Sequence, residues 1–134
     1  MPKILIVEDS FSMRAFVRSA LEGDRAELGD VDVVEATGGF DALRLLPRGP
    51  YDLVITDINM PDINGLELIH FIRTNEHHRS TPILLISTQS SERDRARGLS
   101  LGADGYLAKP FSVEDLRTAA KAQLARSKSG GTTK

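Results

Sequence analysis

The chain has 134 residues, of which 40% are hydrophobic and 27% charged, a composition typical of one globular domain with a single core. The formal net charge of −2 argues against bulk attraction to nucleic acid or to an anionic membrane, so we expect neither as a partner. The sequence contains no cysteine, which excludes disulfides, thiolate catalysis and cysteine metal sites.

The apolar run nearest the N-terminus is short. It covers residues 4–7 and is followed by Glu8 and Asp9, so it is too short and too quickly ended by acids to be a secretory signal peptide. No segment approaches the roughly 18 apolar residues of a membrane-spanning helix. We therefore expect a soluble protein that works in the cytoplasm.

Short apolar runs alternate with helical patterns along the chain. Five runs have the length, β-branching and flanking breakers of strands; in chain order they are residues 4–7, 31–34, 53–55, 83–86 and 106–108. Each is followed by an apolar stripe of helical spacing. These stripes are Met13, Phe16, Val17, Ala20 and Leu21; Ala42, Leu43 and Leu46; Leu68, Ile69 and Ile72; Ala96, Leu99 and Ala103; and Val113, Leu116, Ala120 and Leu124.

This alternation predicts an α/β fold, with a doubly wound, five-stranded parallel sheet flanked by five helices. The first, third and fourth runs are almost continuously apolar and are expected at the centre of the sheet. Asp32 and Glu35 place the second strand at an edge. Ser112 and Asp115 form a capping-box pattern that starts the last helix. We expect one domain over residues 1–126, and a flexible polar tail or the start of a linker over 127–134.

Polar residues stand where the chain leaves each predicted strand. Glu8 and Asp9 follow the first strand, Asp57 the third, Ser87 the fourth and Lys109 the fifth. Ligands bind at the carboxyl ends of strands in an open parallel sheet, so these side chains are expected at one site. Two carboxylates 4 Å apart repel by roughly 4 kcal/mol at an effective dielectric near 20, so three require a cation, protonation or a nearby ammonium. Oxygen donors alone favour Mg²⁺, with a carboxylate attacking a phosphoryl group.

Four stretches in this order resemble the response-regulator receiver domain of the CheY-like kind. They are ILIVEDS at 4–10, DLVITDINMPDINGLEL at 52–68, ILLIS at 83–87 and GADGYLAKPF at 102–111. The resemblance covers residues 3–126 and implies a flavodoxin-like (βα)5 fold. It implies a switch in two-component signalling that accepts phosphate from a sensor histidine kinase. It further implies a signalling domain rather than an enzyme, catalysing only its own phosphotransfer and dephosphorylation.

The resemblance gives the acidic residues specific roles. Asp57 is expected to be the phosphoacceptor. Asp9 and Asp57 are expected to bind Mg²⁺ through their carboxylates and Asn59 through its backbone carbonyl, with Glu8 acting through a coordinated water.

The resemblance also implies a switch at the other strand ends. Ser87 is expected to hydrogen-bond the phosphoryl group and Lys109 to pair with it. Tyr106 is expected to turn inward as Ser87 moves toward the phosphate, shifting the population between two packings. The Lys109–Pro110 bond is expected to be cis.

The same resemblance places the downstream target on the face formed by the fourth helix, the fifth strand and the fifth helix. We expect a single-domain regulator of the chemotaxis or motility type, as a monomer or weak dimer.

The chain departs from the family pattern at several positions. Gly105 stands where dimerising, DNA-binding members usually carry an acid, which argues against a receiver of a transcription factor. Arg95 and Ala119 stand where motor-binding members tend to carry an apolar residue and a lysine. Thr88 is expected to narrow access for the hydrolytic water, and Gln89 and Asn59 flank the site where side chains tune dephosphorylation.

Two other functions stay open at this point. One is a receiver that belongs to a larger regulator with a DNA-binding or enzymatic effector domain. The other is a metal-dependent phosphatase or phosphotransferase with an aspartyl nucleophile. Enzymes of that kind resembling the haloacid-dehalogenase family need a second acid two residues after the nucleophile, where this chain has Asn59, and also a substrate cap. Turnover of an external phosphate ester distinguishes the enzyme from the receiver.

Several of these residues have plainer interpretations. Asp57 is also a typical turn cap, and Ser10 a typical cap of the first helix. Lys109 taken alone is a typical surface lysine. Tyr106 is a typical strand tyrosine with a solvated hydroxyl. It is the combination of strand ends that favours the receiver site.

The histidines and an arginine-rich stretch are predicted to be solvent-facing. His77 and His78 lie in the polar segment TNEHHRST, which favours a solvated helix end over a metal site. His70 is expected on a partly exposed helix face. The alternation of arginines with acids predicts a solvated face for the fourth helix; the arginines are Arg93, Arg95 and Arg97.

Overall fold

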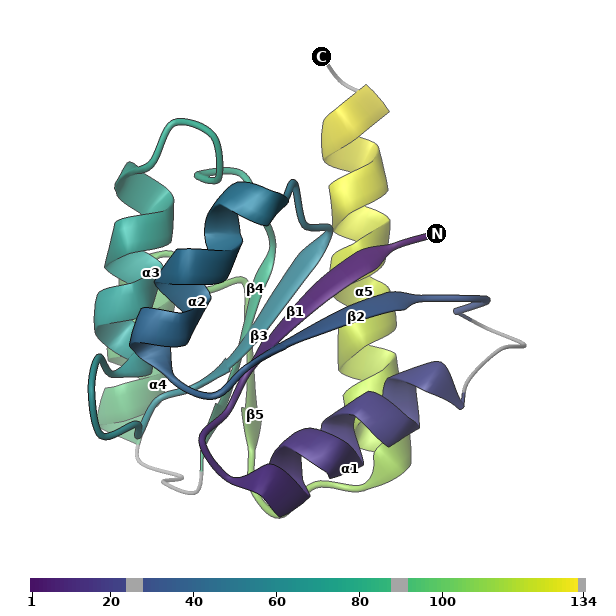
Figure 1. Cartoon of the computed structure of the whole chain (residues 1–134), viewed down its shortest axis with the longest axis horizontal. Helices are drawn as coiled ribbons and strands as arrows, with labels where there is room; N and C mark the ends of the chain where they lie inside the picture. Colours follow the sequence, from purple (N-terminus) through teal and green to yellow (C-terminus); the bar gives the residue numbers. More distant parts are fainter. Residues whose placement is uncertain (24–27, 88–91, 133–134) are drawn as a thin grey trace.

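Strands and helices alternate throughout the described chain (Figure 1). The structure, a computed structural model, describes residues 1–23, 28–87 and 92–132, with side chains up to position 126. In chain order the elements are β1 (Lys3–Val7), α1 (Phe11–Glu22), β2 (Asp32–Ala36), α2 (Gly39–Leu45), the 3₁₀ turn η1 (Leu46–Arg48), β3 (Leu53–Asp57), α3 (Gly65–Thr74), β4 (Ile83–Ser87), α4 (Glu92–Leu101), β5 (Gly105–Ala108) and α5 (Val113–Thr132).

The strands form one parallel sheet in the order β2-β1-β3-β4-β5. The direction of winding reverses between β1 and β3, where Val7 pairs with Thr56. All residues of β3 and β4 are buried, whereas β2 exposes Asp32 at the edge of the sheet. The predicted fold and the predicted edge strand are both confirmed. The reversal creates a gap between connections at the carboxyl ends of β1 and β3, the place where such sheets bind ligands.

Helices cover both faces of the sheet, and alternate residues of each strand face different helices (Figure 1). Leu5 and Val7 of β1 pack in a cluster with Leu68 of α3. Ile4 and Ile6 pack in a second cluster that includes Val17 of α1 and Leu116 of α5. These two layers explain the unbroken apolar character of the central strands, which have no solvent-facing side.

The predicted apolar stripe of α4 is wrong at two of its three residues; the third, Ala103, is buried but lies beyond the end of the helix. Ala96 and Leu99 are exposed, and the buried residue of this helix is Gly98. A Cβ atom on Gly98 would lie 2.3 Å from Cδ1 of Leu85, so α4 packs its backbone directly against β4. The absence of a side chain, rather than an apolar side chain, brings α4 to the sheet, and an apolar count misses such a contact.

The start of α5 is capped as predicted. The Ser112 hydroxyl accepts from the Asp115 amide at 3.0 Å, and the Ser112 amide donates to the Asp115 carboxylate at 3.2 Å. The helix runs to Thr132, into the segment for which a tail or linker is predicted. The division of the chain at residue 126 therefore stays a prediction. Neither α5 nor another described helix is long and apolar enough to cross a membrane.

The turn between α3 and β4 corrects the prediction for the histidine pair. His77 is exposed as predicted, but His78 is only 9% exposed, and its Nδ1 has no hydrogen-bond partner among the described residues. The His78 amide donates to the Asn75 carbonyl and the Thr81 amide to the His78 carbonyl, which folds the chain tightly at this point. His78 lines a hollow together with Pro47 and Pro50, which belong to a loop distant in sequence.

Candidate functional site

The carboxyl ends of β1 and β3 bring three carboxylates together. Glu8 and Asp9 directly follow β1, and Asp57 is the last residue of β3. Each residue offers a carboxylate oxygen, and these oxygens all lie within 4.8 Å of one another. Because β1 and β3 are paired neighbours, the convergence is a direct result of sheet order. We call these three residues and Lys109 the acidic pocket.

The acidic pocket has a buried floor and an exposed rim. Glu8 is 1% exposed and Asp57 is 5% exposed, whereas Asp9 is solvent-facing. Buried carboxylates are rare unless they are paired or bind a cation. The open side next to Asp9 leaves the pocket accessible to an ion or a small group.

Lys109 bridges the two buried acids. Its Nζ atom lies 2.9 Å from Oε1 of Glu8 and 3.2 Å from Oδ2 of Asp57, and its side chain is 9% exposed. Burial on its own would lower the pKa of Lys109. The hydrogen bond to Glu8 and the charges of Asp57 and Glu8 outweigh burial and raise this pKa, so the lysine is held as a cation.

The position of Glu8 disfavours the ionised form of its carboxyl group. Burial raises the pKa of the Glu8 carboxyl most, and the negative charge of Asp57 raises it further. Hydrogen bonds from the Ser10 amide and from Lys109 oppose this shift without cancelling it. Ionised Glu8 is therefore a group whose charge a further cation would stabilise.

A tight turn after β3 presents Asp57. The Gly65 amide donates to the Ile58 carbonyl at 2.8 Å, and a Cβ atom on Gly65 would lie only 2.2 Å from the Asp57 carbonyl oxygen. Only glycine allows this approach of α3 to the end of β3. The cap of α3 is Asn64, whose side chain accepts from the Glu67 amide. Asp57 is thus not the helix cap, and its carboxylate faces the acidic pocket.

The remaining predicted site residues lie around this pocket. Asn59 is exposed, and its amide lies 3.3 Å from Oδ1 of Asp57. Ser87 ends β4, fully buried, and the Lys109 amide donates to its carbonyl at 2.7 Å. Tyr106 is half-buried on β5 and packs against the α3-side core cluster. The Lys109–Pro110 bond is cis, as the resemblance predicts. Thr88 and Gln89 lie outside the described residues.

Asp62, a residue with no role predicted from sequence, links the turn after β3 to α2. Its carboxylate accepts from the Gly39 amide at 3.0 Å and from the Phe40 amide at 2.9 Å. These amide hydrogen bonds hold the pKa of Asp62 below its usual value. The N-cap of α2 is Gly38, which has no side chain to cap the helix. The sequence Thr37-Gly38-Gly39 offers no good capping side chain at the start of α2. This is the one sequence signal that the first amides of α2 need a hydrogen-bond acceptor from another part of the chain.

The pocket residues fit a magnesium ion by charge and by donor type. With all groups ionised, three carboxylates and one ammonium leave a net charge of −2, which a divalent cation would neutralise. The donors are oxygens, the ligands that Mg²⁺ prefers, and neither histidine nor cysteine contributes to the cluster. The exposed rim at Asp9 leaves room for the waters that Mg²⁺ usually retains.

A doubly wound parallel sheet with an acidic pocket and a bridging lysine at its carboxyl end defines a phosphoacceptor-type α/β domain. The family profile described as the response regulator receiver domain matches residues 4–121. The chain belongs to this family, and its CheY-like fold is shown by its sheet order and helices.

Relatives of different length support the assignment. Chemotaxis protein CheY-3 of Vibrio cholerae is 36% identical over 115 residues, covering 86% of this chain and 85% of that protein. Response regulator ArlR of Staphylococcus saprophyticus is 39% identical over 126 residues, covering 94% of this chain and 54% of that protein. The chain thus spans about half the length of ArlR, and 49% of a transcriptional regulatory protein from Picosynechococcus.

Solved structures agree with the fold. The chemotaxis protein CheY4 of Vibrio cholerae, crystallised at low pH, superposes with a TM-score of 0.82 at 33% identity, covering 91% of this chain and 98% of that one. The receiver domain of the Francisella response regulator 1452 gives a TM-score of 0.82 at 28% identity, covering 94% of this chain and 98% of that one.

Proposed function

We propose that this receiver domain is a switch in which Asp57 accepts a phosphoryl group from the phosphohistidine of a sensor histidine kinase. The observation that carries the proposal is the position of the Asp57 carboxylate, buried at 5% exposure and 3.2 Å from the Lys109 ammonium. In the transfer, an Asp57 oxygen forms a bond to phosphorus while the phosphorus–nitrogen bond of the donor breaks. The electron pair of that bond goes to the leaving imidazole.

The proposed cofactor is Mg²⁺. Asp9 and Asp57 would hold it through their carboxylates, Asn59 through its backbone carbonyl and Glu8 through a water. The mutual approach of the three carboxylates within 4.8 Å supports this set. When bound, Mg²⁺ would neutralise negative charge on the transferring phosphoryl group. The chain's own contribution is to hold the buried Asp57 carboxylate in place and to keep Lys109 charged beside it.

Ser87 and Tyr106 are proposed to convert phosphorylation into a change of shape. Ser87 would hydrogen-bond the phosphoryl oxygens while Lys109 pairs with them. The half-buried state of Tyr106 supports a side chain that has both an inward and an outward position. A phosphoryl group that favours the inward position would shift the population toward that packing.

The output face is proposed to be the surface of α4, β5 and α5. Three arginines of α4 are solvent-facing as predicted: Arg93, Arg95 and Arg97. They leave α4 with an exposed, basic-leaning surface on which a downstream protein can dock. We propose a cytoplasmic, monomeric or weakly dimeric regulator of the chemotaxis or motility type. The 36% identity to chemotaxis protein CheY-3 supports this type.

The alternative is a receiver that is part of a larger regulator, which the length of ArlR supports. In either case the domain is proposed to catalyse only its own phosphorylation and dephosphorylation. Repeated hydrolysis of an external phosphate ester would instead favour a phosphatase. Asn59 stands two residues after Asp57, where phosphatases resembling the haloacid-dehalogenase family need a second acid, and this favours self-modification.

The test is intact mass spectrometry after incubation with Mg²⁺ and a small acyl phosphate. We expect one added phosphoryl group that EDTA prevents and that Asp57→Asn abolishes. Asp62→Asn is the matched control, because Asp62 lies in the same turn but binds α2 amides instead of facing the pocket. No adduct on the wild-type chain under conditions where Mg²⁺ binds would contradict the proposed chemistry.

A further inference from the structure

We propose that Arg14 and Glu35 are positioning residues that hold the Glu8–Asp9 peptide in the orientation the divalent cation needs. The inference rests on the proposed function, because it assigns a role toward the proposed Mg²⁺ site. It concerns residues of α1 and β2 that lie outside the acidic pocket and that the receiver motifs do not include.

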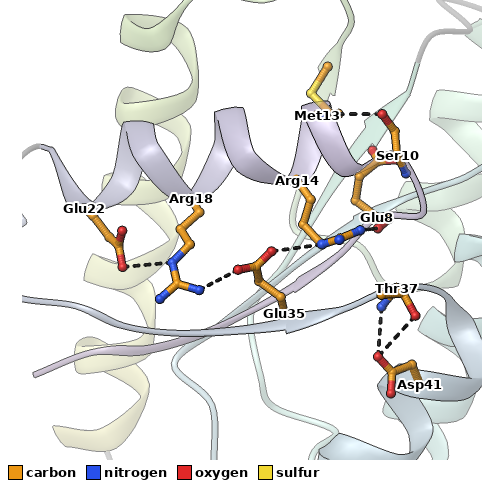
Figure 2. A network of polar contacts seen from close by, with 9 residues as sticks. All are labelled: Glu8, Ser10, Met13, Arg14, Arg18, Glu22, Glu35, Thr37 and Asp41. Carbon is orange, nitrogen blue, oxygen red and sulfur yellow. Dashed lines mark hydrogen bonds and ion pairs between the residues drawn. The ribbon is translucent and has the colours of Figure 1, made fainter.

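Arg14 spans the distance between the pocket and β2 (Figure 2). Its Nη1 atom donates to the backbone carbonyl of Glu8 at 2.8 Å, and its Nε atom donates to Oε1 of Glu35 at 2.9 Å. The Arg14 side chain is only 12% exposed, whereas that of Glu35 is 29% exposed, so the guanidinium itself is largely removed from water. A planar guanidinium that donates in two fixed directions defines the position of one partner relative to the other.

The carbonyl that Arg14 holds belongs to the peptide joining Glu8 to Asp9. The amide of Glu8 donates to the Ala36 carbonyl at 3.1 Å, so the residue is fixed from its other side as well. Because a peptide is planar, fixing the Glu8 carbonyl also fixes the direction in which the chain enters Asp9. Asp9 is exposed, so the fixed peptide limits the directions in which its carboxylate can point.

Glu35 is in turn held in place by a second arginine. Nη1 of Arg18 donates to Oε2 of Glu35 at 2.5 Å, and Nε of Arg18 donates to Oε2 of Glu22 at 3.0 Å (Figure 2). The hydrogen bond from Arg18, and then that from Arg14, hold the pKa of the Glu35 carboxyl below its usual value. Glu35 is therefore ionised at neutral pH and gives Arg14 a charge-assisted anchor.

Arg14 and Arg18 form a matched pair for experiment. Both lie on α1 and both bind Glu35, but only Arg14 also binds an atom of the pocket turn among the hydrogen bonds of the described residues. A purely structural role for the α1–β2 contact predicts similar effects of losing either arginine. A positioning role predicts that only the loss of Arg14 weakens the cation site.

The experiment measures the Mg²⁺ dissociation constant by NMR titration of backbone amides, using folded protein without any phosphodonor. Outer residues that orient metal ligands typically change affinity by about 10–100-fold, so we expect Arg14→Met to weaken Mg²⁺ binding at least about 10-fold. We expect Arg18→Met to stay within about twofold of the wild type, as a surface substitution does. The lysine of Arg14→Lys can donate a hydrogen bond but lacks the planar fork, so we expect the Mg²⁺ dissociation constant of this variant to lie between those of the other two.

Each outcome separates this inference from the proposed function. If the wild-type chain shows no Mg²⁺-dependent shifts around Asp9 and Asp57, the proposed metal site itself is wrong. If the wild type binds and Arg14→Met binds equally well, the positioning role alone is overturned. Should Arg14→Met fail to fold, Arg14→Lys decides the question, because wild-type affinity in that variant would contradict a requirement for the fork.

Discussion

The ammonium of Lys109 lies 3.2 Å from the Oδ2 atom of Asp57, close enough to neutralise the proposed phosphoacceptor before any cation or phosphate arrives. The same ammonium lies 2.9 Å from Glu8. Lys109 therefore does two things that oppose each other. It stabilises the metal-free acidic pocket, and it repels the cation that the pocket is proposed to bind.

Replacing Lys109 by methionine is expected to reveal both effects. Without Mg²⁺, the two buried acids lose their counter-charge, and the free energy of unfolding should fall by about 2–4 kcal/mol. With Mg²⁺, the variant should gain more stability than the wild type does, because the ion now meets no ammonium. Thermal unfolding followed by circular dichroism, with Mg²⁺ and with EDTA, measures both. Lys121→Met, at an exposed position of α5, is the control. A variant whose Tm responds to Mg²⁺ no more than the wild type would count against this account.

Replacing Gly65 by alanine is expected to disturb the turn that presents Asp57. The new Cβ would lie 2.2 Å from the Asp57 carbonyl oxygen and 2.9 Å from Cα of Ile58, and both are backbone atoms that cannot rotate away. We expect a loss of about 1–3 kcal/mol in the free energy of unfolding by urea, with slower phosphorylation from an acyl phosphate.

Gly98→Ala is the contrasting variant for this prediction. Its Cβ would lie 2.3 Å from Cδ1 of Leu85, the end of a flexible side chain, and 3.8 Å from Cδ2 of Leu66, whereas alanine favours the helix. It should phosphorylate at the wild-type rate even if its stability changes. Equal phosphorylation rates for Gly65→Ala and the wild type would show that the close approach of α3 does not position Asp57.

The buried His78 is expected to make stability depend on pH. Burial lowers the pKa of His78 below its ordinary value near 6.5, and the neighbouring His77 lowers it further. The unfolded chain therefore binds the proton more readily, so stability should fall as pH drops below about 6.5, by at most about 1.4 kcal/mol per pH unit. Urea unfolding between about pH 7 and about pH 5 measures this slope.

Comparison with a substituted chain isolates the contribution of His78. His78→Phe keeps a buried ring without a titrating group, so its stability should fall less than that of the wild type over the same range. His70→Gln, at an exposed position of α3, should keep the wild-type slope. Parallel curves for His78→Phe and the wild type would mean that His78 does not titrate differently on folding.

The Asp62 contact is expected to protect the start of α2. Asp62→Ala removes the acceptor of the Gly39 and Phe40 amides, and the described structure offers these two amides no side-chain cap from α2 itself. Both amides should exchange with solvent faster in the variant, while amides in the centre of α3 keep their protection. Hydrogen exchange followed by NMR reads these positions separately. Unchanged exchange at Gly39 and Phe40 would remove the argument for this link.

The positions of the strand-end residues can be predicted from sequence, because the end of a buried strand is marked by the change from apolar to polar residues. The buried run before Asp57 and the acids after Val7 predict where each side chain leaves the sheet, and parallel pairing then places those ends together. Such patterns involve only residues that are adjacent in sequence, so they can be interpreted without knowledge of the fold. This is why the sheet, its edge strand and the composition of the acidic pocket could be predicted.

The features that were missed depend on residues far apart in the chain. His78 is adjacent to polar residues in sequence, but it is buried and shares a hollow with Pro47 and Pro50. Asp62 reaches α2, and Arg14 joins Glu8 to Glu35 across three elements. The packing of α4 against the sheet through Gly98 involves no apolar side chain of α4, so no apolar residue in the sequence marks it. None of these contacts can be inferred before the elements are packed against one another.

The most direct test of the account is to find which side chain carries the phosphoryl group. Borohydride reduces an aspartyl phosphate to homoserine, and peptide mass spectrometry then locates the altered residue. After incubation with Mg²⁺ and an acyl phosphate, we expect homoserine at position 57 and unmodified Asp9 and Asp62. Homoserine at position 9, or a phosphoryl group that survives as an adduct on another residue with Asp57 unchanged, would contradict the assignment of Asp57 as the phosphoacceptor.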